Sequence, residues 1–246
     1  MVKLGVIQTK SYSSNQQGIK SVSRLLTGLG KKETDIVCLP EQWLQNNRIS
    51  SFEKEFADFA EIAKDYSMTV IPGAFYERRK HRFAIAAPVI GPNGEFIGRQ
   101  DKIHPFDYER NLVNPGKEAK IFKTACKFGI VICYDMVFPQ VANSFVKKGA
   151  EVLLSPSRIV KRGVIPWHLY VQTRALENRI PILAANVSNH RFGGESLIVE
   201  LVEKDKVMIP KLLAKLEGES SAAKNFLLSK YTKSRMTRFS DARGFS

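Results

Sequence analysis

Three residues suited to covalent chemistry each follow a short apolar segment of the chain. Glu41 follows residues 35–39, Lys102 follows residues 95–99, and Cys133 follows residues 128–132. Apolar runs of this length are typical of buried strands, and the loops after such strands gather reactive groups on a rigid scaffold. We therefore expect a carboxylate, an ammonium and a thiol from distant parts of the chain to meet in one pocket.

Cys133 has a setting that favours a reactive thiol. It lies between a buried strand and a helix expected to begin near Phe138, and the positive end of a helix lowers the pKa of a nearby thiol. The main-chain N–H of Tyr134 is placed to donate a hydrogen bond to an oxyanion. From spacing alone, however, a small buried apolar residue is the commoner role of a free cysteine. Cys38 and Cys126 lack a comparable setting, and we assign them structural roles.

The elements that must position these residues alternate between short apolar strands and amphipathic helices. Helices are expected over residues 16–29, from a capping box at Ser50 and Glu53 onward, and over residues 138–148 and 166–178. Strands are expected over residues 2–8, 35–39, 69–76, 82–90, 95–100, 119–124, 127–133, 152–154, 181–187 and 196–201. Long apolar strands between helices fit an αββα sandwich or a doubly wound α/β fold, and the pattern alone does not separate the two.

The pattern weakens from residue 211 onward. Residues 220–223 are interpreted as the start of a last short helix, and the basic segment 231–246 as an extension over the surface or over a partner subunit. We find no linker long enough to divide the chain, so we expect one domain over residues 1–246, with 211–246 as a basic C-terminal extension.

Composition narrows the functional class. No apolar run approaches the roughly 18–20 residues that cross a bilayer, and residues 1–7 read as a strand, so we expect a cytoplasmic protein without a membrane partner. Three cysteines without zinc-ligand spacing indicate neither a disulfide framework nor a metal site. The net charge of +14 is spread along the chain. Its densest cluster, residues 78–82, has no interleaved aromatic residues, so we expect no specific nucleic-acid partner.

Four segments resemble motifs of the nitrilase superfamily of carbon–nitrogen hydrolases, and they occur in the order typical of that family. Residues 39–41 (Leu-Pro-Glu) resemble its general-base motif, and residues 101–109 resemble its lysine motif, including a second glutamate, Glu109. Residues 129–139, around Cys133, resemble the nucleophile motif, and segments within residues 167–186 resemble the helix and strand that follow it. Gln140 and Asn143 depart from the common family pattern, because many members have Glu and Arg at these positions.

The resemblance implies an αββα sandwich and a Glu41–Lys102–Cys133 mechanism without a metal or other cofactor. Glu41 would act as the base, Cys133 as the nucleophile that forms a thioester, and Lys102 with the Tyr134 amide would stabilise the oxyanion. Glu109 would hold Lys102 and the substrate in place. The family forms dimers, often through the face that bears the helix after the nucleophile, so a homodimer or larger homo-oligomer is expected. Loops 106–116, 134–138 and 157–166 are expected to form the pocket walls.

Several alternatives stay open. Residues 133–135 read Cys-Tyr-Asp, whereas nitrile hydrolysis usually accompanies Cys-Trp-Glu in this family, so we favour a small amide or N-carbamoyl substrate over a nitrile. A catalytically idle relative with a binding or scaffold role is the second functional class. A papain-like reading with His104 or His168 is less favoured, because Glu41 as base needs no histidine. Asp135 is expected to brace the turn after the nucleophile.

Overall fold

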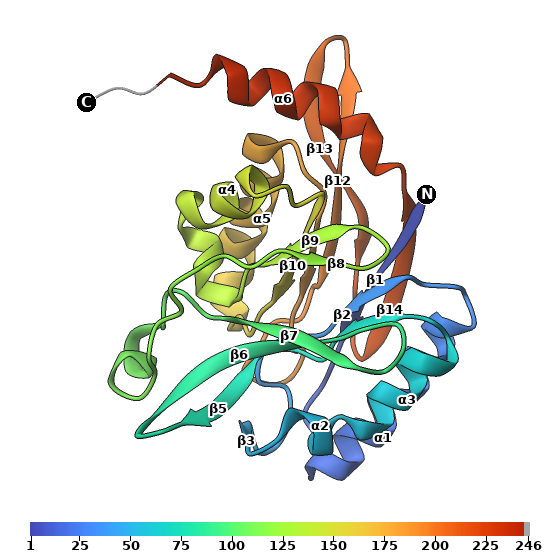
Figure 1. Cartoon of the computed structure of the whole chain (residues 1–246), viewed down its shortest axis with the longest axis vertical. Coiled ribbons are helices and arrows are strands. Elements are labelled where there is room, and N and C mark those ends of the chain that lie inside the picture. Colours follow the sequence, from blue (N-terminus) through green and yellow to red (C-terminus); the bar gives the residue numbers. More distant parts are fainter. Residues whose placement is uncertain (244–246) are drawn as a thin grey trace.

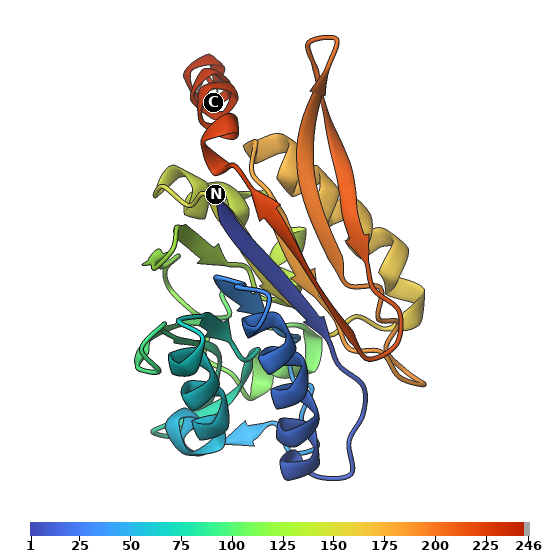
Figure 2. The same ribbon diagram turned by 90° about the vertical axis from the view of Figure 1, so that its right-hand side faces the viewer.

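Two β-sheets stack face to face, and helices cover the outer face of each sheet (Figures 1 and 2). The computed structural model describes residues 1–243 of the chain. The four layers form the expected αββα sandwich. They exclude the doubly wound alternative, in which one sheet carries helices on both faces.

The first sheet has eight strands in the order β14-β1-β2-β4-β6-β5-β3, and β7 also pairs with β6. Its strands are β1 (Val2–Gln8), β2 (Ile36–Cys38), β3 (Arg48–Ile49), β4 (Thr69–Ile71), β5 (Phe75–Arg79), β6 (Arg82–Ile90), β7 (Phe96–Asp101) and β14 (Ser220–Phe226). Strands β1, β2 and β4 run parallel, so their carboxyl ends share one edge of the sheet. Glu41 follows β2 at this edge.

The second sheet has six strands in the order β13-β12-β11-β10-β9-β8. They are β8 (Phe122–Lys123), β9 (Lys127–Ile130), β10 (Val152–Pro156), β11 (Ile182–Ala185), β12 (Leu197–Lys204) and β13 (Val207–Lys215). Strands β9, β10 and β11 are parallel. Cys133 follows β9 and Arg158 follows β10, so both residues emerge at the carboxyl edge of this sheet.

Helices α1 (Asn15–Gly30) and α3 (Ala57–Asp65) pack on the first sheet, and α4 (Pro139–Lys147) and α5 (Val164–Asn178) pack on the second. The short helix α2 (Phe52–Glu55) is separated from α3 at Phe56. The helix starts differ slightly from expectation: Ser14 caps α1 by accepting a hydrogen bond from the Gln17 N–H, and Ser51, instead of Ser50, caps α2. Within residues 1–243, no helix is long and apolar enough to cross a membrane.

Strand β2 of the first sheet is apolar on both faces, because both faces of the sheet are covered at this position. In β2, Ile36 and Cys38 face the core between the sheets, where Ile130 of β9 also lies. Val37, the residue between them, packs instead in the second core, beneath α1 and α3. Alternate residues of a strand point to opposite faces, so a strand buried on both sides reads as a continuous apolar run.

Several expected strands are shorter or divided; of residues 119–124, for example, only Phe122–Lys123 form a strand, β8. The strand expected over residues 69–76 is two strands, β4 and β5, separated around Gly73. Gly73 has a φ of +116°, and a Cβ there would lie 2.1 Å from the Pro40 carbonyl oxygen, so only glycine lets the two segments cross this closely. The strand expected to reach residue 133 ends at Ile130, and Cys133 lies in the 3₁₀ turn η2 (Cys133–Val137).

The C-terminal part of the chain differs most from expectation. Residues 220–223, expected to start a helix, lie in strand β14, which pairs antiparallel with β1 from Val2↔Phe226 to Gln8↔Ser220. Residues 211–215 belong to β13, so much of the expected extension forms part of the two sheets. Helix α6 (Thr232–Asp241) lies outside them, drawn in red in Figure 1, and has no buried residue. Residues 244–246 of the expected extension lie outside the described residues.

Candidate active site

Glu41 is held at the carboxyl edge of the first sheet by main-chain contacts to both sheets. Its N–H donates to the Ser157 carbonyl oxygen at 3.1 Å, and it forms an isolated bridge with Ala74. The first contact joins the segment after β2 to the segment after β10, and therefore joins the two sheets. The Glu41 side chain is almost fully buried, so its carboxylate needs partners inside the protein.

Lys102 supplies that partner. Its Nζ lies 2.8 Å from Glu41 Oε1 and 2.8 Å from Glu109 Oε2, and the side chains of all three residues are at most 3% exposed. Lys102 follows β7, and Glu109 lies on the 3₁₀ turn η1 (Asp107–Asn111). The two expected carboxylates and the expected lysine therefore lie in one buried cluster, although Glu41 and Lys102 are 61 positions apart in sequence.

Opposing effects act on the charges of this cluster. Burial lowers the pKa of Lys102, but the negative charges of Glu41 and Glu109, together with that of Cys133 when it is ionised, outweigh burial and raise the pKa above its ordinary value. Burial and the neighbouring Glu41 raise the pKa of Glu109, although Lys102 opposes the rise. Glu109 also accepts hydrogen bonds from the Phe106 N–H at 2.7 Å and from Gln42 Nε2 at 3.5 Å. The lysine is thus held as an ammonium between two oriented carboxyl groups.

Cys133 joins the same cluster from the second sheet. Its thiol interacts with the Glu41 carboxylate, the Lys102 ammonium and the main-chain N–H of Arg158. Its φ is +47°, a left-handed backbone conformation that costs a non-glycine residue about 1–3 kcal/mol. This strained turn, placed after β9, directs the side chain towards the residues that follow β2 and β7.

The pKa of Cys133 differs from the expectation of an acidified thiol. Burial and the adjacent Glu41 carboxylate raise the pKa above that of an ordinary cysteine, and Lys102 offsets this only in part. Helix α4 begins at Pro139, close to its expected start, so burial and the Glu41 carboxylate, and not a missing helix, account for the raised pKa. The resting residue is therefore a thiol that needs a base to remove its proton.

Asp135 braces the turn after Cys133, as expected. Its carboxylate accepts hydrogen bonds from the Ile103 N–H at 3.0 Å and from the His104 N–H at 2.7 Å, and it lies 2.9 Å from His104 Nδ1. The His104 ring in turn stacks on Phe138, with ring centroids 3.8 Å apart. The segment directly after Lys102 is thereby tied to the turn that carries Cys133.

The contacts of His168, Cys38 and Cys126 fit the structural roles expected for them. His168 Nε2 lies 2.9 Å from the Glu195 carbonyl oxygen, and burial lowers the pKa of His168, which fits a packed, hydrogen-bonded histidine. Cys38 and Cys126 are buried in the core between the sheets. Asn143, one of the two departures from the family pattern, donates from Nδ2 to Asn178 Oδ1 at 3.2 Å, which links α4 to α5.

A cavity of about 280 Å³ opens beside Cys133. Its walls come from the three loops expected to form them and from the first turns of α5. The lining residues are Phe106, Cys133, Tyr134, Met136, Val137, Arg158, Ile159, Val160, Gly163, Pro166, Trp167 and Tyr170. Arg158 is the site residue that the sequence reading missed, although a polar residue directly after an apolar strand is the signal that identified Glu41, Lys102 and Cys133.

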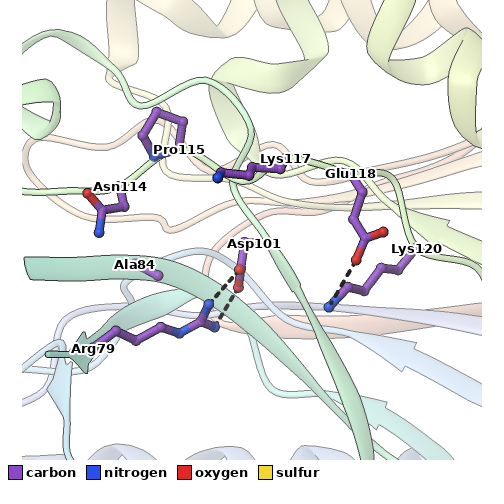
Figure 3. Close-up of a pocket in the computed structure, with 8 residues that line it drawn as sticks. All are labelled: Arg79, Ala84, Asp101, Asn114, Pro115, Lys117, Glu118 and Lys120. Atoms are coloured by element: carbon purple, nitrogen blue, oxygen red, sulfur yellow. Dashed lines mark hydrogen bonds and ion pairs between the residues drawn. The ribbon is translucent and has the colours of Figure 1, made fainter.

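A second cavity, of about 530 Å³, lies beside β5 and β7 and contains no nucleophile (Figure 3). Four of its charged groups form two pairs: the Arg79 guanidinium makes two hydrogen bonds of 2.7 Å to the Asp101 carboxylate, and Lys120 Nζ lies 3.6 Å from Glu118. Among residues 1–243, no group of three or more His, Cys, Asp or Glu side chains is arranged to hold a metal ion.

Comparison with known proteins places this chain in a family. The Carbon-nitrogen hydrolase family model matches residues 3–202. The omega-amidase NIT2-B of Xenopus laevis is 27% identical over 207 residues, which cover 75% of this chain and 74% of that protein.

Solved structures share the fold. A carbon-nitrogen hydrolase from Helicobacter pylori G27 matches with a TM-score of 0.85 at 24% identity, over 98% of this chain and 95% of that chain. A variant of the amidase from Nesterenkonia sp. AN1, in complex with butyramide, matches with a TM-score of 0.78 at 16% identity, over 97% and 95% of the two chains. The resemblance found in the motifs is thus confirmed, and because the family model spans most of its length, this chain belongs to the carbon-nitrogen hydrolase family.

Proposed function

We propose that this protein hydrolyses the carbon–nitrogen bond of a small amide or N-carbamoyl compound through a thioester on Cys133. The observation that carries the proposal is the Lys102 ammonium, which lies 2.8 Å from both Glu41 and Glu109 in a buried cluster that also holds the Cys133 thiol. The curated omega-amidase relative supports an amide as the substrate.

In the first step, the Cys133 sulfur attacks the carbonyl carbon while Glu41 takes the thiol proton. The raised pKa of Cys133, caused by burial and by Glu41, makes this base necessary, and the contact between the two side chains makes the transfer direct. Negative charge then develops on the carbonyl oxygen. Lys102 and the Tyr134 N–H would stabilise it, and a single donor of this kind contributes about 3–4 kcal/mol in well-studied enzymes.

In the second step, the carbon–nitrogen bond breaks as Glu41 returns its proton to the departing ammonia or amine. The acyl group remains on Cys133 as a thioester. Glu41 then takes a proton from water, which attacks the thioester carbon and releases the carboxylic acid and the free thiol. Glu109 keeps Lys102 charged and in position, through the 2.8 Å contact, in every step.

Ammonia release from a panel of simple amides, N-carbamoyl amino acids and nitriles tests the proposal. We expect release from amides or N-carbamoyl compounds, loss of release in Cys133→Ala, and unchanged release in Cys126→Ala, because Cys126 is buried in the core and lies outside the cavity. Full activity in Cys133→Ala would refute the mechanism. Labelling of Cys133 without release from any compound would favour the idle alternative.

We also propose that the protein forms a homodimer through its α4–α5 layer. Two large apolar side chains on α5, Ile165 and Leu169, are 75% and 61% exposed and lie one helical turn apart. An exposed apolar strip on a helix is typical of a surface that another chain covers. This layer also supplies Trp167 and Tyr170 to the cavity wall, so a partner on it would lie close to the active site.

A further inference from the structure

The side-chain amide of Asn186 is a polar group completely enclosed by the protein. Asn186 directly follows β11 and is fully buried. Its Oδ1 accepts hydrogen bonds from the Ile159 N–H at 2.8 Å and from the Val187 N–H at 2.9 Å. Its Nδ2 donates to the carbonyl oxygens of Gly194 at 2.7 Å and of Ile159 at 3.5 Å. The amide therefore uses its whole hydrogen-bonding capacity, and two of its four bonds hold Ile159.

Ile159 lies where the ladder between β10 and β11 ends. The ladder closes with a main-chain bond from the Ser157 N–H to the Ala185 carbonyl oxygen at 2.8 Å. The next N–H that points the same way belongs to Ile159, and its acceptor is the Asn186 side chain instead of a main-chain oxygen. The side-chain amide thus extends the ladder by one hydrogen bond and holds the segment that follows β10.

The N–H of Arg158 points away from β11. Successive N–H groups of an extended segment alternate in direction, so an N–H between two that face β11 faces the strand on the other side of β10. That strand is β9, and Cys133 follows it. Burial and Glu41 raise the pKa of Cys133, whereas the Arg158 N–H, which contacts the thiol there, lowers it. The bond that holds Ile159 therefore also orients the N–H that contacts the sulfur.

The same short segment also contacts the residue assigned as the base. The Ser157 carbonyl oxygen accepts a hydrogen bond from the Glu41 N–H at 3.1 Å. Residues 157–159 therefore contact Glu41 and Cys133 through main-chain atoms alone. A shift of this segment would change the surroundings of both groups, although no side chain of the cluster itself would have been altered.

Asn186 is itself held by further buried hydrogen bonds. Its N–H donates to Ser196 Oγ at 2.8 Å, and the Ser196 N–H and Oγ donate to Gln8 Oε1 at 2.8 Å and 2.9 Å. Gln8 ends β1 of the first sheet and donates to the Gly218 carbonyl oxygen at 2.7 Å. The side chains of Gln8, Asn186 and Ser196 are completely buried. Buried polar groups that satisfy one another in this way are rigid, so Asn186 is a fixed support for Ile159.

We propose that Asn186 is a positioning residue for the active site, which holds residues 157–159 so that the Arg158 N–H stays on the Cys133 sulfur. This inference rests on the proposed function, in which that sulfur becomes negative as it loses its proton and attacks. Asn186 does not line the cavity beside Cys133, so it acts through Arg158 and not on the substrate.

Alkylation of Cys133 by iodoacetamide, followed by mass spectrometry, tests the proposal without a substrate. Asn186→Leu replaces the amide with an apolar group of similar size. Loss of a hydrogen bond to a charged group reduces the thiolate fraction by about 10- to 100-fold. A more basic thiolate is also a stronger nucleophile, so about half of this effect on a logarithmic scale reaches the rate. We therefore expect Cys133 of Asn186→Leu to react about 3- to 10-fold more slowly at about pH 8.

A merely structural role of Asn186 predicts the opposite change. Loosening of the fold would expose the Cys133 thiol and accelerate its alkylation. Cys38 and Cys126 are buried and report such loosening in the same experiment, because their labelling accelerates when the protein opens. The proposal requires slower labelling of Cys133 while the labelling of Cys38 and Cys126 stays unchanged.

Asn178→Leu is the matched control. Asn178 is also a buried asparagine, and it donates to the Arg174 carbonyl oxygen at 2.9 Å and accepts from Asn143 Nδ2 at 3.2 Å. Neither bond reaches residues 157–159, so this variant loses a buried amide of the same kind without releasing the segment. Its Cys133 should react at the rate of the unchanged protein. Equal slowing in Asn178→Leu would overturn the inference.

Ser196→Ala is a milder variant that decides the matter if Asn186→Leu does not fold. It removes the acceptor of the Asn186 N–H and leaves the side-chain amide in place. Loss of one neutral hydrogen bond in the support should slow Cys133 alkylation by a smaller factor, about 2- to 3-fold. An unchanged or faster reaction of Cys133 in Asn186→Leu, or in Ser196→Ala if the first variant does not fold, would overturn the inference.

Kinetics separate this inference from the proposed function. With an amide that the unchanged protein hydrolyses, Asn186→Leu should lower kcat and kcat/KM by the same factor, because Asn186 does not contact the substrate. A raised KM with an unchanged kcat would overturn the positioning role and leave amide hydrolysis intact. If no amide is hydrolysed, the proposed function fails, and the alkylation rates still decide whether Asn186 positions the N–H on Cys133.

Discussion

Replacing Lys102 with methionine should destabilise the protein in a pH-dependent way. In the native cluster, one carboxylate oxygen of Glu41 and one of Glu109 each lie 2.8 Å from Lys102 Nζ, so these oxygens are no more than twice that distance apart. Methionine retains the apolar part of the side chain and removes the charge. The substitution therefore leaves two buried carboxylates close together without a cation between them.

The size of the effect follows from that separation. Two like charges at this distance repel by about 3 kcal/mol at an effective dielectric constant of about 20. This energy corresponds to roughly two pH units in the pKa of one carboxyl group. Burial and Glu41 already raise the pKa of Glu109, and loss of Lys102 removes the charge that opposes the rise. The variant should therefore hold a proton on the pair at a pH where free glutamate is ionised.

The change of protein stability with pH follows from the linkage between proton binding and folding. A carboxyl group with a raised pKa in the folded state binds its proton more tightly there than in the unfolded chain. Its contribution to stability is therefore present below the unfolded pKa and is lost as the pH rises through the folded pKa. Urea unfolding of Lys102→Met should show a deficit that grows from about pH 5 to about pH 8 and approaches about 3 kcal/mol.

The double variant Lys102→Met/Glu109→Gln is the control, because it removes one of the two negative charges and hence the repulsion. Its free energy of unfolding should exceed that of Lys102→Met at about pH 8, and the difference should shrink towards about pH 5. A difference of constant size across this range, or none at all, would refute the reasoning. The two carboxylates would then not share Lys102 as the geometry shows.

Three further predictions concern the turn, the thiol and the helix surface. Asp135→Ala removes the acceptor of two main-chain N–H groups and of His104 Nδ1, and should lower the free energy of unfolding by about 3 kcal/mol in urea titrations; an unchanged midpoint would contradict the bracing role. Because burial and Glu41 raise the pKa of Cys133, its alkylation by iodoacetamide, followed by mass spectrometry, should still accelerate through about pH 9; a plateau below about pH 8 would indicate an acidified thiol. Leu169→Glu should convert the proposed homodimer to monomer in sedimentation at micromolar concentration, and a clean monomer in the unchanged protein would remove the dimer proposal.

Part of the site could be predicted because its signals are local. Glu41, Lys102 and Cys133 each follow an apolar segment, and the turn or loop after a strand is visible in the order of residue types along the chain. Arg158 gives the same signal after β10 and could have been found in the same way. Its place in the wall of the cavity is not visible in the sequence, however, because the cavity is formed by residues that are remote from one another along the chain.

Strand β14 shows that local sequence patterns are also insufficient to predict part of the fold. Residues 220–223 are serine and alanine, which have no strong preference for strands, and the segment was therefore expected to be helical. Pairing with β1, more than 200 positions earlier in the chain, makes it a strand. Backbone hydrogen bonds to a distant edge outweigh weak local preferences, and no local pattern encodes them.

By itself, the sequence determined the apolar strands, the helices between them and the reactive residues that follow β2, β7 and β9, because these features depend on neighbours along the chain. The tertiary structure decided the ionisation of the site. Cys133 was expected to be acidified by a helix, but burial and contact with Glu41, which follows a strand of the other sheet, raise its pKa instead. A pKa depends on the solvent and charges that surround a group in space, and these are set only when the two sheets come together.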